Sequence, residues 1–317
     1  MSVENEKKTI RIKIMDFWAS CDFENTTMCH ILRKHYNIEY CNNPDFIICS
    51  IFGKERSKYD AVSLCYSGEN ASVSLLEHDY AIDFDDYEYI DRHYCMPIWF
   101  WRDEGIGNTK AMKTKHQRAE ELFKEKKAFC SLVSSHHTPQ RHKMLDALNE
   151  YKRVDCAGNV GHNVDIPSGI KAVVDFESTH KFSIAFEHSS REDYITEKLV
   201  QSFAAGTIPI YWGAPNVTKY FNPDAMIVIK DESDIPTAVD RIKEIDNNDE
   251  LYLNMLRQPA LVPGAEKRID EFLPGLERFL LNIFDQEPAK ARRRGTASPD
   301  AYDYNFRILR ACYLKKN

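Results

Sequence analysis

The chain has 317 residues, of which 43% are hydrophobic and 29% are charged, a balance typical of a globular protein with material for two cores. Its net charge of −7 argues against a general nucleic-acid-binding protein. The first twenty residues lack an apolar signal segment, and the longest apolar run, 96–101, is too short to span a bilayer. The nine cysteines form no CxxC pair, which favours buried reduced thiols. We therefore expect a cytoplasmic protein.

Short apolar runs alternate with turns through the first hundred residues. Strands are expected at 9–15, 38–41, 45–50, 61–66 and 78–84, with a helix at 27–36 and a closing apolar segment at 94–101. This alternation predicts an N-terminal α/β domain over residues 1–102. The polar segment 103–118, which contains two glycines, is interpreted as a linker.

The second half repeats the alternation and predicts a second α/β domain over residues 119–285. Its expected elements are helices at 117–126, 139–151, 235–245, 250–257 and 266–284 and strands at 128–134 and 225–229, besides the unit described next. The segment 154–163 is interpreted as a loop. Thr138 and Pro139 are typical of a helix start, which places Arg141 in a first helical turn just beyond a strand.

The stretch 181–213 has the pattern strand, loop, helix, strand. Thr196 is expected to cap the helix, and Gly206 follows its end. A unit of this size is a βαβ crossover, which implies a parallel sheet covered on both faces. Such sheets bind ligands at the carboxyl ends of their strands, where helix N-termini offer N–H groups to phosphates. Tyr194 and Lys198 lie at that end.

Four side chains near the strand ends suit a phosphorylated ligand, and each has a simpler interpretation. Lys198 places a positive charge at the positive end of the helix dipole, which is unfavourable unless an anion such as a diphosphate binds there. It can also be a solvated surface lysine. Glu197 is either an ordinary first-turn acid or an acceptor for ribose hydroxyls. Tyr194 is either a core residue or a phosphate ligand, and Arg141 either a surface residue or a planar donor fork.

Glu69 lies in a loop of small residues after a strand of the first half. It is either a solvated acid or a general base, and the second role calls for partial burial and a raised pKa. His136 and His137 are discounted as a metal pair, because no carboxylate lies at helical spacing from them. The sequence has no P-loop, GxGxxG or GxSxG motif. The residues alone thus indicate two α/β domains and a phosphate-competent site, the layout of an enzyme that uses a nucleotide-linked donor.

The stretch FSIAFEHSSREDYITEKLVQSFAAGTIPIYWGAPNVTKYFNPDAMI closely resembles the donor-binding region of the α1,3/4-fucosyltransferase family, especially its bacterial members. The shared motif residues are Phe186-Glu187, Tyr194 to Lys198, Pro209, Tyr211 to Pro215 and Phe221 to Pro223. Tyr66 to Asn70 resembles the GEN segment of the family, and QRHKMLDALNEY resembles the helix with its phosphate-binding arginine. The resemblance extends over residues 9–284.

This resemblance implies the GT-B fold, two Rossmann-like α/β domains that face a central cleft. By matched position, Glu69 would be the catalytic base of the acceptor-side domain. Arg141 and Lys198 would bind the GDP diphosphate, Tyr194 would contact the phosphate-sugar region, and Glu197 would bind the ribose.

His188 is a departure from the family pattern. The family usually has asparagine after the Phe-Glu pair, so His188 would put an imidazole in place of an amide in the donor site.

The implied activity is inverting transfer of L-fucose from GDP-β-L-fucose to the 3-OH of GlcNAc in an N-acetyllactosamine-type acceptor, which gives a Lewis X-type product. No cofactor is required for it, and a stimulating divalent cation (Mn or Mg) is left open. Two alternatives remain: a GT-B transferase with another nucleotide sugar, and a non-catalytic nucleotide- or carbohydrate-binding protein.

The tail 286–317 is basic and amphipathic, with eight basic and two acidic residues between Lys290 and Asn317. It is interpreted as packing back on the N-terminal domain. A second interpretation is peripheral contact with the anionic inner membrane of a bacterium.

Overall fold

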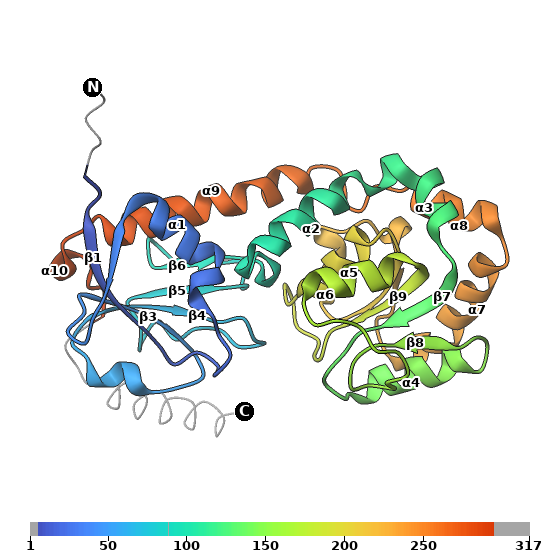
Figure 1. Ribbon diagram of the computed structural model, residues 1–317, viewed down its shortest axis with the longest axis horizontal. Coiled ribbons are helices and arrows are strands. Elements are labelled where there is room, and N and C mark those ends of the chain that lie inside the picture. Colours follow the sequence, from blue (N-terminus) through green and yellow to red (C-terminus); the bar gives the residue numbers. More distant parts are fainter. Residues whose placement is uncertain (1–5, 88, 295–317) are drawn as a thin grey trace, which may run out of the picture. The chain divides into compact units, whose positions relative to one another are not determined.

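The computed structural model describes residues 6–87 and 89–294, and these residues separate into two compact units (Figure 1). The described part of unit 1 comprises residues 6–96 together with 272–294, and unit 2 comprises 97–271. Each unit is built on its own sheet, and Figure 1 shows the strands of unit 1 in blue to cyan and those of unit 2 in green to gold.

Unit 1 has a six-stranded sheet in its described residues, in which all neighbouring strands are parallel, in the order β2-β1-β3-β4-β5-β6. Its strands are β1 (Thr9–Met15), β2 (Asn37–Tyr40), β3 (Phe46–Ser50), β4 (Val62–Tyr66), β5 (Tyr80–Asp83) and β6 (His93–Cys95). Strands β3 and β4 are buried along their whole length, as expected for a parallel sheet that is covered on both faces.

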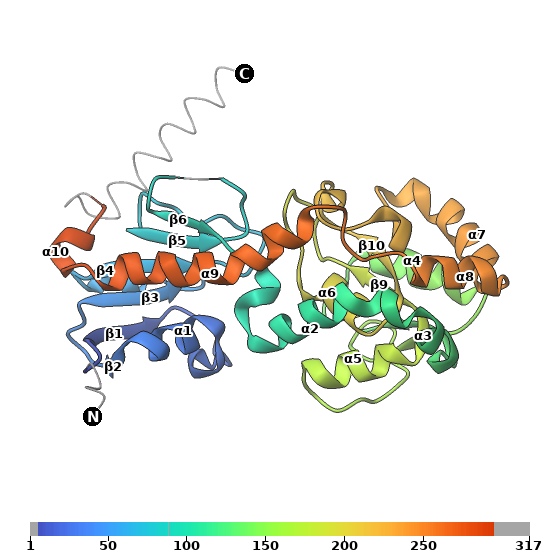
Figure 2. The ribbon, with the colours of Figure 1, turned by 90° about the horizontal axis from the view of Figure 1, so that it is seen from above.

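One face of this sheet packs against the C-terminal half of the long helix α9 (Ala265–Phe284) (Figure 2). The ring of Phe284 contacts Phe46, and that of Phe279 contacts Tyr80. The other helical segments of the unit are η1 (Phe23–Asn25), α1 (Thr27–His35), η2 (Glu55–Lys58) and α10 (Pro288–Ala291), where η marks a 3₁₀ helix.

Unit 2 has a parallel sheet of five strands among the residues described, in the order β11-β10-β9-β7-β8. Its strands are β7 (Ala128–Leu132), β8 (Val154–Cys156), β9 (His180–Phe186), β10 (Ile208–Trp212) and β11 (Ile227–Val228). Helix α6 (Glu197–Ala204) connects β9 to β10, and Gly206 reverses the chain after it with a φ of 68°. The predicted βαβ crossover is therefore confirmed.

The remaining helices of unit 2 cover this sheet and carry much of its core. They are η3 (Ile98–Trp101), α2 (Asp103–Thr114), η4 (Lys115–Arg118), α3 (Ala119–Glu125), α4 (Pro139–Asn149), α5 (Ile170–Ser178), η5 (Val217–Lys219), η6 (Pro223–Ala225), η7 (Glu232–Asp234), α7 (Ile235–Asp246) and α8 (Asp249–Leu256). Strand β8 and helix α5 were not predicted, and β8 lies in the segment interpreted as a loop.

The segment 103–118 is helical and is not an extended linker. It forms α2 and η4, and its buried residues Thr109, Met112 and Lys115 are 5%, 0% and 3% exposed. A glycine is needed at position 105 of this helix, because a Cβ there would lie 1.6 Å from the carbonyl oxygen of Trp99. The glycine thus permits a close approach of two backbones.

The boundary predicted at residue 285 also differs from the structure. The chain from Phe272 onward belongs to unit 1, since the aromatic residues of α9 pack on its sheet. In the described part of the tail, Arg292, Arg293 and Arg294 pair with acidic residues of unit 1, namely Asp60, Asp91 and Asp79. Residues 295–317, where most of the predicted amphipathic end falls, lie outside the described residues. Among the helices that the structure describes, none has the length and apolar character to cross a bilayer.

Candidate functional site

The candidate site of unit 2 lies where the strand order of its sheet reverses. The chain leaves β7 for β8 on one side, whereas β9 is followed by β10 on the other side. The carboxyl ends of β7 and β9 therefore flank a topological switch point, the position where open α/β sheets bind ligands. Arg141 follows β7, Glu187 and His188 follow β9, and Lys198 lies in the first turn of α6.

Arg141 bridges the two sides of this switch point. Its side chain is 1% exposed, and Nε (3.2 Å) and Nη2 (2.5 Å) both donate to the carbonyl oxygen of Phe186 at the end of β9. Nη1 donates to the carbonyl oxygen of His136 after β7 at 2.7 Å. Because a guanidinium has five N–H groups, two remain for a ligand. Burial lowers the pKa of Arg141, but guanidinium groups stay charged at neutral pH.

Glu187 is fully buried and organises the start of α6. Its carboxylate accepts hydrogen bonds from the backbone N–H of Thr196 (2.8 Å) and from the Thr196 hydroxyl (2.6 Å). Thr196 occupies the N-cap position as predicted, but its hydroxyl bonds to Glu187 and does not cap the helix. The N–H groups of the first turn of α6 therefore lack a side-chain cap and are suited to an anion.

Gly213 makes room for this arrangement. A Cβ at Gly213 would lie 2.4 Å from Cγ of Glu187 and 2.7 Å from the hydroxyl oxygen of Tyr211. Glu187 and Gly213 both lie in the shared motif, but residue type and position gave neither of them a predicted role.

Lys198 and Glu197 form an ion pair at the mouth of the site. Nζ of Lys198 lies 2.8 Å from Oε1 of Glu197 and 3.9 Å from Oε2 of Glu187, and the side chains of Lys198 and Glu197 are 24% and 42% exposed. Burial by itself lowers the pKa of Lys198, but Glu197 and Glu187 outweigh it and raise the pKa above its ordinary value. Burial raises the pKa of Glu197 and Lys198 lowers it, with a net decrease. Both groups are therefore charged at neutral pH.

His188 and Tyr194 belong to the loop between β9 and α6, which leads to this ion pair. The hydroxyl of Tyr194 lies 3.0 Å from Nδ1 of His188, and the Tyr194 ring is buried whereas the imidazole is exposed. This contact orients the residue that departs from the family pattern. The structure thus brings Arg141, Glu197 and Lys198 together with His188 and Tyr194 at one end of one sheet.

Glu69 belongs to unit 1, where it follows β4 in a tight turn. Its backbone carbonyl oxygen accepts hydrogen bonds from the N–H of Ala71 (2.6 Å) and the hydroxyl of Ser67 (3.3 Å). The side chain is exposed, so the partial burial expected for a general base is not found. The turn places the residue at the carboxyl edge of the sheet, which is the ligand-binding edge of such folds.

Three side chains within the described ranges are close enough to hold a metal ion, and all three belong to unit 1. Cys49, Cys65 and His78 gather on one face of the sheet of unit 1, with Sγ of Cys49 3.7 Å from Nδ1 of His78. His137 pairs with His142, at 2.9 Å between Nδ1 and Nε2, and not with His136. The phosphate-competent site is therefore built from cations and N–H groups.

The fold and the site define a class: two-sheet α/β proteins whose switch point suits a phosphorylated ligand. Comparison with known proteins narrows this class. The model of the glycosyltransferase family 10 (fucosyltransferase) C-terminal domain matches residues 122–258, and that of the alpha-(1,3)-fucosyltransferase FucT N-terminal domain matches residues 12–101. The chain belongs to glycosyltransferase family 10, the fucosyltransferase family.

Individual relatives agree with this assignment. The chain is 30% identical over 290 residues to the alpha-(1,3)-fucosyltransferase FucT of Helicobacter pylori, which covers 80% of this chain and 60% of that protein. Over 79 residues it is 39% identical to the 4-galactosyl-N-acetylglucosaminide 3-alpha-L-fucosyltransferase 9 of Pan troglodytes (24% of this chain and 22% of that protein). The chain thus spans less than two thirds of the length of these relatives.

A solved structure matches residues of both units. The crystal structure of an alpha1,3-fucosyltransferase with GDP-fucose matches with a TM-score of 0.68 and 26% identity, over 87% of this chain and 93% of that chain. This match confirms the GT-B fold expected from the resemblance.

Proposed function

We propose that the chain is an inverting α1,3-fucosyltransferase. It transfers L-fucose from GDP-β-L-fucose to the 3-OH of GlcNAc in an N-acetyllactosamine-type acceptor and gives a Lewis X-type product. The observation that carries the proposal is the pairing of a buried arginine fork and a lysine with an uncapped helix N-terminus, at the switch point of unit 2.

The donor site suits a nucleoside diphosphate. The two free N–H groups of Arg141, the ammonium of Lys198 and the first-turn N–H groups of α6 are all donors to phosphate oxygens. Glu197 can accept the ribose hydroxyls, while Tyr194 and His188 lie at the phosphate-sugar region. These cations stabilise the charge that develops on GDP as it leaves, so no general acid is needed.

The acceptor requires a base, because a sugar hydroxyl is a poor nucleophile. Glu69 takes the proton of the acceptor hydroxyl. At the same time the oxygen of this hydroxyl attacks C1 of fucose, on the face opposite to the departing GDP. Attack from the opposite face inverts the β-linked donor to an α-fucoside. The names of the relatives from Helicobacter pylori and Pan troglodytes support the 3-linkage, and the second name supports the galactosyl-N-acetylglucosamine acceptor.

No step of this mechanism passes through a metal, since the cations of the protein already face the diphosphate. We therefore expect transfer to continue in EDTA, with Mn or Mg acting at most as a stimulant. GDP release from GDP-fucose, measured in EDTA with and without acceptor, tests this point. Loss of all turnover in EDTA, with recovery on adding Mn, would contradict it.

Replacing Glu69 by glutamine tests the base. The variant should lose turnover by at least about a hundredfold while its affinity for GDP is unchanged. Glu77→Gln is the matched control, since Glu77 precedes β5 and lies at the opposite edge of the same sheet. Equal turnover of Glu69→Gln and wild type would exclude Glu69 as the base.

The two alternative functions give different results in the same assay. Faster hydrolysis of UDP- or CMP-sugars than of GDP-fucose would identify a transferase with another donor. GDP binding without turnover by the wild type, with every acceptor, would identify a binding protein.

The proposed reaction takes place in the bacterial cytoplasm at the inner membrane, where lipid-linked acceptors lie. Arg292 to Arg294 pair with acidic side chains of unit 1, so the basic residues that support peripheral attachment to anionic lipid are Arg307, Arg310, Lys315 and Lys316. Sedimentation with phosphatidylglycerol vesicles measures this attachment, and a chain that stays in the supernatant at low salt would argue against it.

A further inference from the structure

Aromatic side chains gather at the carboxyl edge of the sheet of unit 1. Tyr40 is the last residue of β2, Phe17 and Trp18 follow β1, and Phe52 follows β3. Because the strand order is β2-β1-β3-β4, these residues follow the edge in that order and lead to Glu69, which comes after β4. Phe52 is 50% exposed and Tyr40 is 47% exposed, so the edge presents aromatic surface to solvent.

Ring contacts connect Phe23, Phe17, Trp18 and Phe52 into one row. The ring centroids of Phe23 and Phe17 lie 6.2 Å apart, those of Phe17 and Trp18 5.9 Å, and those of Trp18 and Phe52 5.9 Å. Trp18 and Phe52 meet edge to face, a favourable geometry for aromatic pairs. The row therefore runs without a break from Phe23 to Phe52, beside the switch point between β1 and β3.

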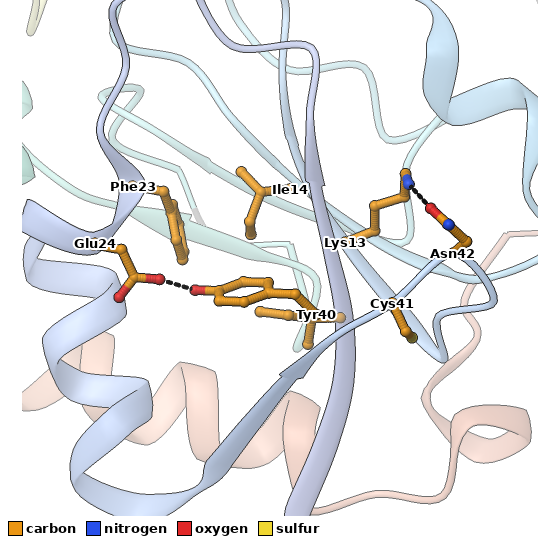
Figure 3. Close-up of a pocket in the computed structure, with 8 residues that line it drawn as sticks. Lys13, Ile14, Phe23, Glu24, Tyr40, Cys41 and Asn42 are labelled. Carbon is orange, nitrogen blue, oxygen red and sulfur yellow. Dashed lines mark hydrogen bonds between the residues drawn. The ribbon is translucent and has the colours of Figure 1, made fainter.

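A pocket lies at the end of the row that is farther from Glu69 (Figure 3). It opens where β2 leaves β1, since their pairing ends at Tyr40 and Ile12. Its volume is about 380 Å³, and its lining residues are Ile12, Lys13, Ile14, Phe23, Glu24, Tyr40, Cys41 and Asn42.

Polar groups fix the aromatic wall of this pocket in place. The hydroxyl of Tyr40 donates a short hydrogen bond to Glu24, as Figure 3 shows, and Nε of Arg33 donates to the same carboxylate at 2.8 Å. Nζ of Lys13 donates to Oδ1 of Asn42 at 2.8 Å. The pocket thus combines a half-exposed aromatic ring with a carboxylate, an amide and an ammonium group at its rim.

This combination suits a pyranose ring. The C–H face of a sugar packs against an aromatic ring, and its hydroxyls both donate and accept, so they match a rim that contains carboxylate, amide and ammonium groups. A volume of this size is within the ordinary range for small-ligand sites. A long apolar ligand fits less well, because it would cover the charged groups of Lys13 and Glu24 without offering them a hydrogen bond.

The pocket is separated from Glu69 by a distance that an oligosaccharide can bridge. Strands β1 and β3 lie between β2 and β4, so the ends of β2 and β4 are about 14 Å apart, the length of roughly three linked sugars. The aromatic row occupies this interval.

We propose that the pocket beside Tyr40 is a second carbohydrate subsite, which binds a sugar of an extended acceptor a short distance along the chain from the residue that receives fucose. The proposal rests on the proposed function, because it takes Glu69 as the point of attack. It predicts an enzyme that prefers oligomeric acceptors to a disaccharide.

Acceptor length provides the test. The kcat/KM of the wild type is compared for N-acetyllactosamine and for its linear trimer, and binding of both sugars is measured by calorimetry without donor. We expect the trimer to be preferred by about fivefold, through KM. Tyr40→Ala should abolish the preference and leave the disaccharide kinetics unchanged. Tyr40→Phe, which keeps the ring, should retain most of it.

Leu76→Ala is the matched control, because Leu76 is also 47% exposed but precedes β5 at the opposite edge of the sheet. An unchanged preference in Tyr40→Ala, or an equal loss for both acceptors, would overturn the subsite. Failure of the proposed function has a different outcome: no acceptor is fucosylated. In that case trimer binding that Tyr40→Ala loses and Leu76→Ala retains still supports the pocket, whereas no binding by the wild type overturns it.

Discussion

Replacing Arg141 by lysine separates the structural role of this residue from its proposed role in donor binding. The substitution keeps the positive charge but removes the planar fork. In the wild type, three N–H groups of Arg141 donate to the carbonyl oxygens of Phe186 and His136, and two more are free for a diphosphate. A lysine ammonium is a single point and cannot serve both carbonyls and a ligand.

The cost follows from these contacts. One of the two carbonyl oxygens loses its partner, and a buried acceptor without a hydrogen bond costs roughly 1–3 kcal/mol. The lost donor was a charged group, whose hydrogen bonds contribute about 1.5–3 kcal/mol. We therefore expect Arg141→Lys to lower the free energy of unfolding of unit 2 by about 3 kcal/mol. For a unit of this size the loss corresponds to a melting temperature lower by about 10 °C.

Thermal unfolding with and without GDP measures both roles. GDP should raise the melting temperature of the wild type, because a ligand that binds the folded state stabilises it, and the increase should be much smaller in Arg141→Lys. Arg153→Lys is a suitable control, since Arg153 is 66% exposed and pairs with Asp155 only at the surface. A variant with the melting temperature of the wild type would refute the structural argument. A lower melting temperature with an undiminished GDP effect would refute the diphosphate role.

Three further predictions concern the surroundings of the site. Burial raises the pKa of Glu177 to about 7, so its contribution to stability is present below pH 4.5 and is lost as pH rises through 7. Urea unfolding at pH 5 and pH 8 should therefore show a difference of about 3 kcal/mol that Glu177→Gln removes. Gly213→Ala pushes a methyl group against Glu187 and should cost about 2 kcal/mol and weaken GDP binding, whereas Gly107→Ala, with nothing within 4 Å, should do neither. Tyr194→Phe removes a hydroxyl that contacts the exposed imidazole and should raise the KM for GDP-fucose by about fivefold.

The elements that sequence patterns predicted well are those whose patterns are local. Strand β10 is a continuous apolar run, and in β9 the apolar residues Phe182, Ile184 and Phe186 alternate with smaller ones. Gly206 marks the end of the helix between these two strands. Strand β8 has only three residues, too few for a pattern. Helix α2 was missed for a different reason: it packs through small residues such as Gly105, so its composition resembles that of a linker.

The residues of the candidate site could be predicted from the sequence, but the hydrogen bonds among them could not. Arg141 and the residues of the first turn of α6 were identified from their positions after strands and in a motif. The three hydrogen bonds from Arg141 to backbone carbonyl oxygens could not be predicted. A hydrogen bond from a side chain to a carbonyl oxygen 45 residues away does not affect which residue types occur in the sequence. For the same reason, the motif alone did not indicate that Glu187 is buried or that its carboxylate accepts two hydrogen bonds from Thr196.

The two carboxylates beside Lys198 explain how this half-buried lysine stays charged before a donor binds. Burial lowers the pKa of Lys198, and the neighbouring Arg141 cation lowers it further, so the ammonium depends on Glu197 and Glu187. Glu187 cannot leave this arrangement, because Thr196 holds both of its oxygens, whereas Glu197 is 42% exposed. A diphosphate that takes over the Lys198 ammonium would release the Glu197 carboxylate to accept other donors, such as the ribose hydroxyls. Donor binding would then exchange one ion pair for another without leaving a buried charge unpaired, which is the condition for a charged site of this depth to be stable.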